Sequence, residues 1–217
     1  MLSLRVRGPM ALFTIPEFKA ERVSYPVMTP SAARGILEAV LWKPAIRWHV
    51  RRIAVLAPIK FIAFRRNEVN SKARRPDARL INEGGMFDPY FADLDRAQRN
   101  TIALRDVDYL IHADFSLTDR AGDGDNVPKF VDMFTRRVER GQYFHHPYLG
   151  SREFPADIEA SAGTERPIEE SRDLGLMLWD IIYAADGNRA RFFRARLESG
   201  VLHVPEDPEA TIAEVAA

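Results

Sequence analysis

The chain has 217 residues, of which 46% are hydrophobic and 29% are charged, a composition typical of globular proteins and unlike that of disordered or membrane-embedded chains. It contains no cysteine, which excludes disulfides, thiolate catalysis and cysteine-ligated metal centres. Its formal net charge is zero, and no segment resembles a secretory signal or approaches the roughly 18 apolar residues of a membrane span. We therefore expect a cytoplasmic protein that has no membrane partner.

The neutral total hides an uneven distribution of charge. Between Lys43 and Arg79 there are eleven basic and two acidic residues, whereas residues 153–217 contain fourteen acidic and six basic residues. Aromatic side chains that could stack on bases interleave with the basic run: Trp42, Trp48, Phe61 and Phe64. This pattern is typical of a surface that neutralises phosphates. The alternative is a solvated strand face above an aromatic core, and composition alone leaves both open.

The first half of the chain predicts one strand, one helix and two further strands. A short strand over Leu2–Arg7 precedes a proline-containing loop that runs to Thr29. Thr29 has the character of a helix N-cap, and the following proline and the apolar residues at helical spacing predict a helix that ends before Pro44. Alternation with a period of two between residues 45 and 64 predicts two strands that are broken near Pro58.

The second half predicts an insertion, a strand, a helix and a group of strands. Residues 66–100 show little periodicity and are predicted to form a long insertion. A strand is predicted over Asp106–Leu117, followed by a turn and a helix that starts at Val127 and ends near Gly141. The C-terminal part predicts three short strands, of which the last two are joined by a hairpin turn at Ser199–Gly200.

This order predicts an α+β fold. Residues 1–150 are expected to form a ferredoxin-like (RRM-like) domain, with the insertion around residues 66–100, and residues 151–217 a small antiparallel β-sheet domain. The RRM form of this scaffold presents a sheet to single-stranded RNA, although a fold by itself does not establish a function.

Four segments of the chain resemble a known family: FKAERVSYPVMTPSAARGILEAVLWKPAIRW, RRNEVNSK, MFTRRVERGQYFHHPYLGSREF and SRDLGLMLWDI. They are similar to the type I-C (Dvulg subtype) CRISPR-associated proteins of Cas family five, and the similarity runs from about residue 6 to about residue 204. The resemblance implies an RNA-binding protein that cleaves precursor CRISPR RNA (crRNA) at the base of the repeat hairpin. It then stays on the 5′ handle beside the backbone and large subunits of the interference complex.

The resemblance also implies a metal-independent reaction without cofactors, in which a ribose 2′-hydroxyl attacks the adjacent phosphate. In the family a tyrosine before the Trp-Lys-Pro motif and a Lys-His pair at the start of the second helix carry the reaction. The corresponding positions here are Leu41 and the pair Lys129–Phe130. Leucine and phenylalanine neither donate nor accept protons, so Lys129 alone retains a function, which is to stabilise the phosphate.

Three other residues are possible substitutes for the missing proton-transfer groups: His49, His112 and Tyr25. Each has an ordinary alternative as a packed or exposed side chain without a catalytic role. The neighbouring pair His145–His146 lacks the spacing and partners of a metal site, so we expect no bound metal.

Two interpretations therefore stay open: an endoribonuclease with rearranged proton-transfer groups, and a non-catalytic subunit that holds the crRNA 5′ handle. A third interpretation, a ferredoxin-like protein unrelated to RNA, is disfavoured by the ordered motifs. For Arg136 and Arg137 the alternative to RNA contact is an ion pair with Glu139 or Glu153. The residues expected to contact RNA are Lys43, Arg47, Arg65, Arg66, Asn67, Arg136 and Arg137.

Overall fold

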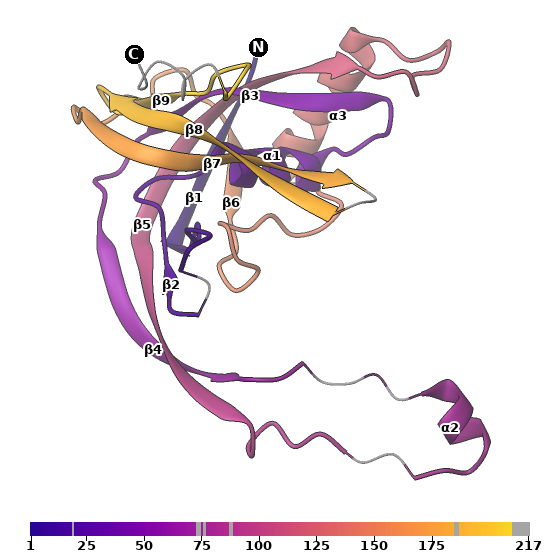
Figure 1. Ribbon diagram of the computed structural model, residues 1–217. Coiled ribbons are helices and arrows are strands. Elements are labelled where there is room, and N and C mark those ends of the chain that lie inside the picture. Colours follow the sequence, from indigo (N-terminus) through magenta and orange to yellow (C-terminus); the bar gives the residue numbers. More distant parts are fainter. Residues whose placement is uncertain (19, 73–74, 76, 87–88, 185–186, 210–217) are drawn as a thin grey trace.

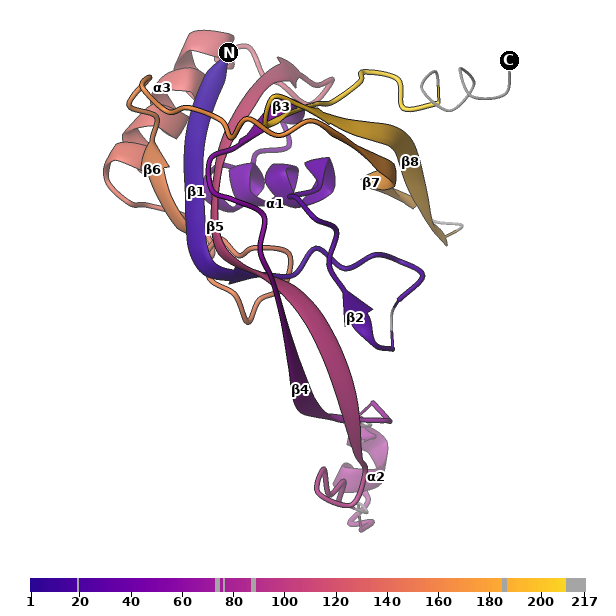
Figure 2. The same cartoon turned by 90° about the vertical axis from the view of Figure 1, so that its left-hand side faces the viewer.

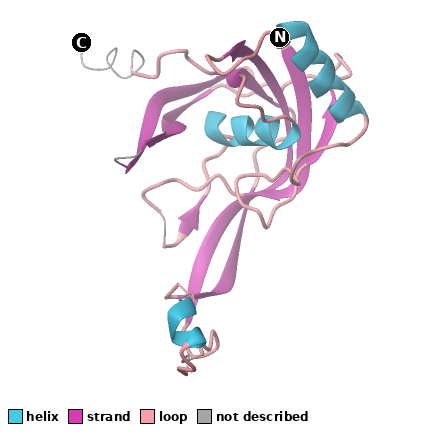
Figure 3. Ribbon diagram, turned by 90° about the vertical axis from the view of Figure 1, so that its right-hand side faces the viewer, coloured by secondary structure: helices cyan, strands magenta, loops and turns pink. Residues whose placement is uncertain are grey.

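The structure is a computed structural model that describes residues 1–18, 20–72, 75, 77–86, 89–184 and 187–209. Within these residues the fold is α+β and contains three helices beside one nine-stranded sheet (Figure 3). The strands are β1 (Leu2–Ala11), β2 (Arg22–Val23), β3 (Ile46–Val55), β4 (Phe61–Val69), β5 (Arg96–Leu117), β6 (Asp157–Ala160), β7 (Arg172–Ala184), β8 (Gly187–Glu198) and β9 (Val201–His203). The helices are α1 (Pro30–Val40), α2 (Ala78–Asn82) and α3 (Val127–Glu139).

The sheet order is β6-β1-β5-β3-β9-β8-β7, and β2 and β4 pair with β5 outside this path. All pairs are antiparallel except that of β2 with β5. The strands β1 and β3, which α1 connects, therefore lie on either side of β5. No helix in the described part of the chain is long and apolar enough to cross a membrane.

Helix α1 confirms the prediction made from its N-cap. The Thr29 hydroxyl accepts a hydrogen bond from the amide of Ala32 at 3.2 Å, and Pro30 occupies the first turn, where its missing amide costs nothing. The helix buries Ile36, Leu37 and other apolar residues against the sheet. It ends at Val40, so that residue 41 lies exactly at its C-terminus.

Helix α3 is likewise built as the sequence predicts. The side chain of Asn126 accepts from the amide of Lys129 at 3.0 Å, which caps the helix N-terminus. Phe130, Phe134 and Val138 form the buried stripe. Gly141 has a φ of 60°, the left-handed conformation that commonly ends helices.

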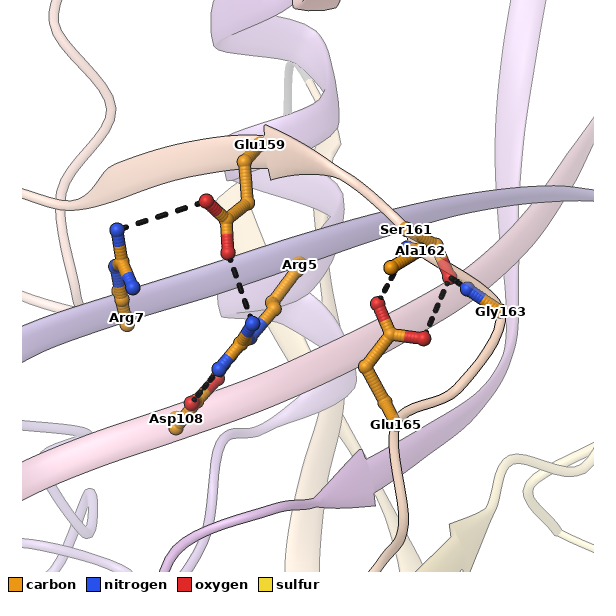
Figure 4. Close-up of polar contacts among 8 residues, drawn as sticks. All are labelled: Arg5, Arg7, Asp108, Glu159, Ser161, Ala162, Gly163 and Glu165. Carbon is orange, nitrogen blue, oxygen red and sulfur yellow. Dashed lines mark hydrogen bonds and ion pairs between the residues drawn. The ribbon is translucent and has the colours of Figure 1, made fainter.

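The two faces of the central sheet differ in character. One face, which packs against α1 and α3, contributes Leu4, Ile53 and Ile111 to the core. The other face is charged, and Figure 4 shows its centre, where Arg5 donates to Asp108 at 2.7 Å and contacts Glu159 at 3.0 Å. Its arginines are thus matched by carboxylates of neighbouring strands.

A long arm leaves the body of the molecule (Figures 1 and 2). It is formed by β4 and the first part of β5, which pair from Phe61 with Leu104 to Val69 with Arg96, and α2 lies near its tip. The sequence predicted little regular structure over residues 66–100, and this was wrong at both ends of the segment. Exposed and partly buried residues alternate along β4, but the partly buried face includes the charged Arg66 and Glu68, so the strand lacks the apolar alternation that identifies a half-buried strand.

The three C-terminal strands and their hairpin confirm the prediction, because Ser199 and Gly200 form the turn with φ values of 46° and 76°. β9 pairs with β3, aligning Leu202 with Ile53, so these strands continue the sheet of the N-terminal part. The long strand β7 packs against α1. The domain boundary at residue 150 stays a prediction.

Candidate functional site

An open groove of about 960 Å³ lies beside β3. β9 pairs with β3 over Arg52–Ala54 and the Val204 amide donates to the Arg51 carbonyl, so residues 46–50 form an edge without a strand partner on that side in the described chain. α1, β7 and residues 204–206 supply the other walls. Six basic residues from distant parts of the sequence line the groove: Arg34, Lys43, Arg47, Arg51, Arg120 and Arg191.

A β-bulge in β3 decides which side chains reach this groove. Val50 pairs with Ala113 and Arg52 pairs with His112, which leaves Arg51 as the extra residue between them. Strand alternation then turns Trp48 toward the helices. Arg47 and His49 point to the opposite face.

The basic groove residues are of two kinds. Arg34 donates two hydrogen bonds to Asp180, at 3.0 and 2.7 Å, which ties α1 to β7. Arg51 bonds to Asp114 and pairs with Glu206. Such arginines are already engaged in holding the groove walls together.

Lys43 and Arg47 are different, because neither has an ion pair or side-chain hydrogen bond within the described residues. Both are exposed, and both line the groove. Their charges are available to a polyanion, since no carboxylate must first be displaced. The structure thus brings together two of the residues that the sequence predicted to contact RNA.

Aromatic side chains lie at the groove as well. Trp42 is 59% exposed and Tyr183 is 72% exposed, although both are large and partly apolar. Trp179 is fixed by a 3.0 Å hydrogen bond from its indole to the Pro205 carbonyl, and the Arg191 guanidinium lies 5.5 Å from its ring centre. Exposed rings beside unpaired cations are the components of a surface for single-stranded nucleic acid.

The positions of the family's missing catalytic groups are closed to solvent. Leu41 is 0% exposed and Phe130 is 2% exposed. Trp48 connects them: its indole donates to the Leu41 carbonyl at 2.9 Å, and its ring packs against Phe115, which in turn contacts Phe130 edge-on. We call these residues the apolar cluster. A substrate cannot reach either position without opening the core.

Lys129 lies at the surface beside the apolar cluster and does not line the groove. Its ammonium is 2.9 Å from Asp125 and donates to the Gly124 carbonyl at 3.3 Å. The hydrogen bond from Lys129 lowers the pKa of Asp125 below its usual range, so this carboxylate remains charged. A phosphate at Lys129 must therefore compete with the turn that precedes α3.

The three possible substitutes fall in different places. Tyr25 is buried, and burial raises the pKa of its hydroxyl to about 12, which makes it a poor proton acceptor or donor near neutral pH. His112 bonds to the Ser3 hydroxyl at 2.8 Å and does not line the groove. His49 does line the groove, where its Nε2 lies 2.8 Å from the Ser116 hydroxyl.

The remaining predicted RNA contacts lie away from the groove. Arg65 and Asn67 are exposed on β4 in the arm, and Arg65 donates to Asn100 at 3.4 Å. Arg66 instead pairs with Glu68 and Glu153, which leaves it less available.

The two arginines of α3 also differ from each other in their contacts. Arg136 is exposed on α3, whereas Arg137 donates to the Val40 carbonyl at 2.6 Å and so caps the C-terminus of α1. The alternative that the sequence left open, an ion pair of these arginines with Glu139 or Glu153, does not form within the described residues.

Sequence reasoning missed Arg34, Arg51 and Trp179, because they come from three elements and form no local motif. Only the sheet order places them together. Among the described residues no group of three or more histidine, aspartate or glutamate side chains is arranged to hold a metal ion.

The known proteins to which this chain is similar are CRISPR-associated proteins. A family model described as "CRISPR-associated protein (Cas_Cas5)", the Cas5d model, matches residues 1–205. The protein named CRISPR pre-crRNA endoribonuclease Cas5d from Mannheimia succiniciproducens is 44% identical, over 94% of each chain. Its namesake from Thermus thermophilus is 42% identical, over 95% of this chain and 92% of the relative.

Among solved structures, one titled "Crystal Structure of CRISPR-associated Protein" superposes with a TM-score of 0.69 at 21% identity, covering 97% of this chain and 93% of the other. At that identity the superposition supports the fold alone. The family model and both relatives span nearly the whole chain, from the N-terminus to the C-terminal strands. This chain belongs to the Cas5d family of CRISPR-associated proteins.

Proposed function

We propose that this chain binds CRISPR repeat RNA in the groove beside β3 and processes precursor crRNA. The observation that carries the proposal concerns Lys43 and Arg47. Neither cation has an ion-pair partner within the described residues, and both line the groove together with the exposed Trp42. This pair lies in a chain 44% identical to a protein named a pre-crRNA endoribonuclease. Cations neutralise phosphates and the indole offers a base a stacking surface.

The reaction we propose is attack of a ribose 2′-hydroxyl on the adjacent phosphate, without a metal ion. It yields a 2′,3′-cyclic phosphate and a free 5′-hydroxyl. Such a reaction needs an acceptor for the proton of the attacking hydroxyl, a proton for the leaving oxygen, and cations beside the phosphate. After cleavage the protein stays on the 5′ handle.

A second candidate function is a non-catalytic subunit that holds the crRNA 5′ handle while another factor cleaves. One observation favours it: Leu41 and Phe130 are packed in the apolar cluster, where no proton transfer to RNA can occur. The two functions share the same RNA surface and differ only in turnover.

The finer description of the fold belongs to this proposal. The order β1-α1-β3-β5-α3-β6, with β1 and β3 on either side of β5, supports a ferredoxin-like N-terminal domain. We infer residues 151–217 to be the smaller β-rich domain, attached through the pairing of β9 with β3. The proposed location is the cytoplasm.

The proposed protein partners are the backbone and large subunits of the type I-C interference complex. Support comes from the arm, whose outer part exposes large apolar side chains, among them Ile81 at 54%, Met86 at 96% and Leu94 at 82%. Isolated exposed apolar residues are common, but several on one projecting element are typical of an interface.

The test is incubation of the pure protein with its own repeat RNA in EDTA, followed by analysis of the RNA ends. A cyclic phosphate upstream of the cut and a 5′-hydroxyl downstream support processing. Intact RNA at saturating protein, with tight and salt-sensitive binding, supports the handle-binding subunit. Binding no tighter than that of a random RNA would contradict both functions.

A further inference from the structure

His49 occupies an unusual position for a histidine in this chain. It lies on the charged face of β3 and is the one histidine among the described residues that line the groove. The neighbouring residues on the same strand are Arg47 and Arg51, and Lys43 lies on the loop that enters β3. A phosphodiester held by these cations would lie beside an imidazole.

The hydrogen bonding of His49 leaves one ring nitrogen open. Nε2 lies 2.8 Å from the Ser116 hydroxyl, which comes from the facing strand β5. Nδ1 has no hydrogen-bond partner within the described part of the chain. In the tautomer where Nε2 donates to Ser116, the lone pair on Nδ1 is free to accept a proton, and the serine fixes the plane of the ring.

The charges around His49 favour its neutral form. Arg47 and Arg51 face it from β3, Asp114 from β5, and Glu206 from the C-terminal segment. Burial is the largest influence and lowers the pKa of His49 below 6.5, Arg51 and Arg47 lower it further, and the two carboxylates oppose them. The imidazole is therefore unprotonated at neutral pH, as a proton acceptor must be.

No comparable group exists at the family's catalytic positions, because Leu41 and Phe130 belong to the apolar cluster and Lys129 offers only a charge. Lys129 does not line the groove, although its partner Asp125 also interacts electrostatically with the groove residue Lys43. A proton acceptor that RNA can reach must accordingly be sought along β3.

We propose that His49 is the general base of RNA cleavage by this chain, taking the proton of the attacking 2′-hydroxyl while Arg47 and Lys43 neutralise the phosphate. This inference rests on the processing function proposed above and relocates its chemistry from the helix termini to the edge of β3. It makes His49 a catalytic residue and Ser116 a positioning residue.

Nδ1 of His49 accepts the 2′-hydroxyl proton as the 2′-oxygen bonds to phosphorus, and the bond from phosphorus to the 5′-oxygen breaks. The departing 5′-oxygen takes a proton from solvent water, and the imidazolium returns its proton to the resulting hydroxide. The products are a 2′,3′-cyclic phosphate and a 5′-hydroxyl, and no water is consumed.

The experiment uses the full chain and an end-labelled RNA transcribed from one repeat of the CRISPR array of the source genome, in EDTA under single-turnover conditions. The test variant is His49→Gln, which keeps a hydrogen-bonding group for Ser116 but cannot act as a base near neutral pH. The matched control is His112→Gln, because His112 also bonds to a serine at 2.8 Å and also has a pKa lowered by burial, yet lies outside the groove. Urea denaturation shows whether both variants fold.

We expect His49→Gln to slow cleavage by at least about 100-fold while changing repeat affinity by less than about three-fold, and His112→Gln to cleave like the parent chain. In the parent chain the rate should rise with pH and level off above the lowered pKa of His49, and this acid limb should be absent in His49→Gln. Free imidazole should partly restore cleavage to His49→Ala, an effect that a purely structural histidine would not show.

Three outcomes overturn the inference, and they differ from one another. If the parent chain binds the repeat without cutting it, the processing function fails and the general base fails with it. If the parent chain cuts and His49→Gln cuts within about three-fold of it, processing stands and the assignment of the base is wrong. If His49→Gln loses affinity and cleavage in the same proportion, His49 is a binding residue only.

Discussion

Two regions meet at β3, and they have opposite physical character. On the helix side, Trp48 joins Leu41, Phe115 and Phe130 in the apolar cluster, which excludes water. At its open edge, Arg47 and His49 line a charged groove. The family resemblance directs attention to the first region, whereas the second has the exposed cations, the rings and the imidazole. Within one fold, the position of a family motif and the position of groups able to react can therefore differ.

The largest expected effect concerns the apolar cluster. Replacing Phe130 with alanine should lower the free energy of unfolding by about 3–5 kcal/mol, because removal of the buried ring leaves a cavity against Phe115. Urea denaturation followed by circular dichroism measures it. The exposed Thr135→Ala on the same helix serves as the control and should change stability by less than about 0.5 kcal/mol. A loss for Phe130→Ala as small as that of the control would show that the ring is not packed.

A second variant tests whether the histidine of the family is tolerated at the position of Phe130. Phe130→His should destabilise the protein by about 1–3 kcal/mol, because the imidazole would be buried with its polar nitrogens unpaired. We expect no gain in RNA cleavage, since the site is closed to solvent. The measurement pairs urea denaturation with the single-turnover assay. An increase in cleavage would move the active site back to the helix termini.

The groove predicts a change in the salt dependence of RNA binding. Arg47→Ala should weaken binding to every RNA sequence by a similar factor and reduce the slope of log affinity against log salt by about one. Filter binding at several salt concentrations measures both quantities. The control is Arg7→Ala on β1, on the same face of the sheet but outside the groove, where Glu159 already neutralises the arginine at 3.5 Å (Figure 4). An equal loss of slope in both variants would argue against the groove as the RNA surface.

A smaller effect is expected at Lys129. Asp125→Asn should raise affinity for repeat RNA by about two- to five-fold at low salt, because it removes a negative charge and releases the ammonium. Lys129→Ala should then abolish the gain in the double variant. If the double variant keeps the gain, the effect of Asp125 does not operate through Lys129.

The smallest expected effect is on the pH dependence of the free energy of unfolding. The folded-state pKa values of His49 and His112 lie below 6.5, so the unfolded chain binds more protons, and stability rises with pH between those lowered values and 6.5. Below that window this contribution is lost. The urea midpoint between about pH 5 and 7 measures it, and His49→Gln with His112→Gln should flatten the slope. An unchanged slope would mean that neither pKa is lowered in the folded chain.

The helices and most strands were predictable from local patterns. The N-caps at Thr29 and Asn126 and the turn at Ser199–Gly200 are signals that neighbouring residues carry by themselves. The arm was missed because charged residues stand on the partly buried face of β4 and remove the apolar alternation, and β6 was missed because it is only four residues long. Sequence periodicity thus reports burial on one face rather than pairing itself.

The site was predictable only in part. Lys43 and Arg47 were expected to contact RNA and lie together in the groove, and His49 was one of three possible substitutes. The role of Arg137 as a cap for α1 could not be foreseen, because its partner Val40 lies far away in the sequence. Long-range pairings decide which charges are free and which are engaged, and no local motif contains that information.

The bulge at Arg51 has a consequence for how chains of this family can diverge. The bulge takes up one extra residue, so Trp48 and Val50 share the core side of the sheet with Ile53, although regular alternation along a strand would place them on opposite faces. Deleting Arg51 would restore a regular ladder in which Trp48 and His49 keep their faces, because Val50 and Arg52 already pair with the adjacent residues Ala113 and His112. A one-residue difference in length at this point of β3 therefore leaves Trp48 in the core and His49 on the charged face, so aligned chains that differ here by one residue can present the same surface.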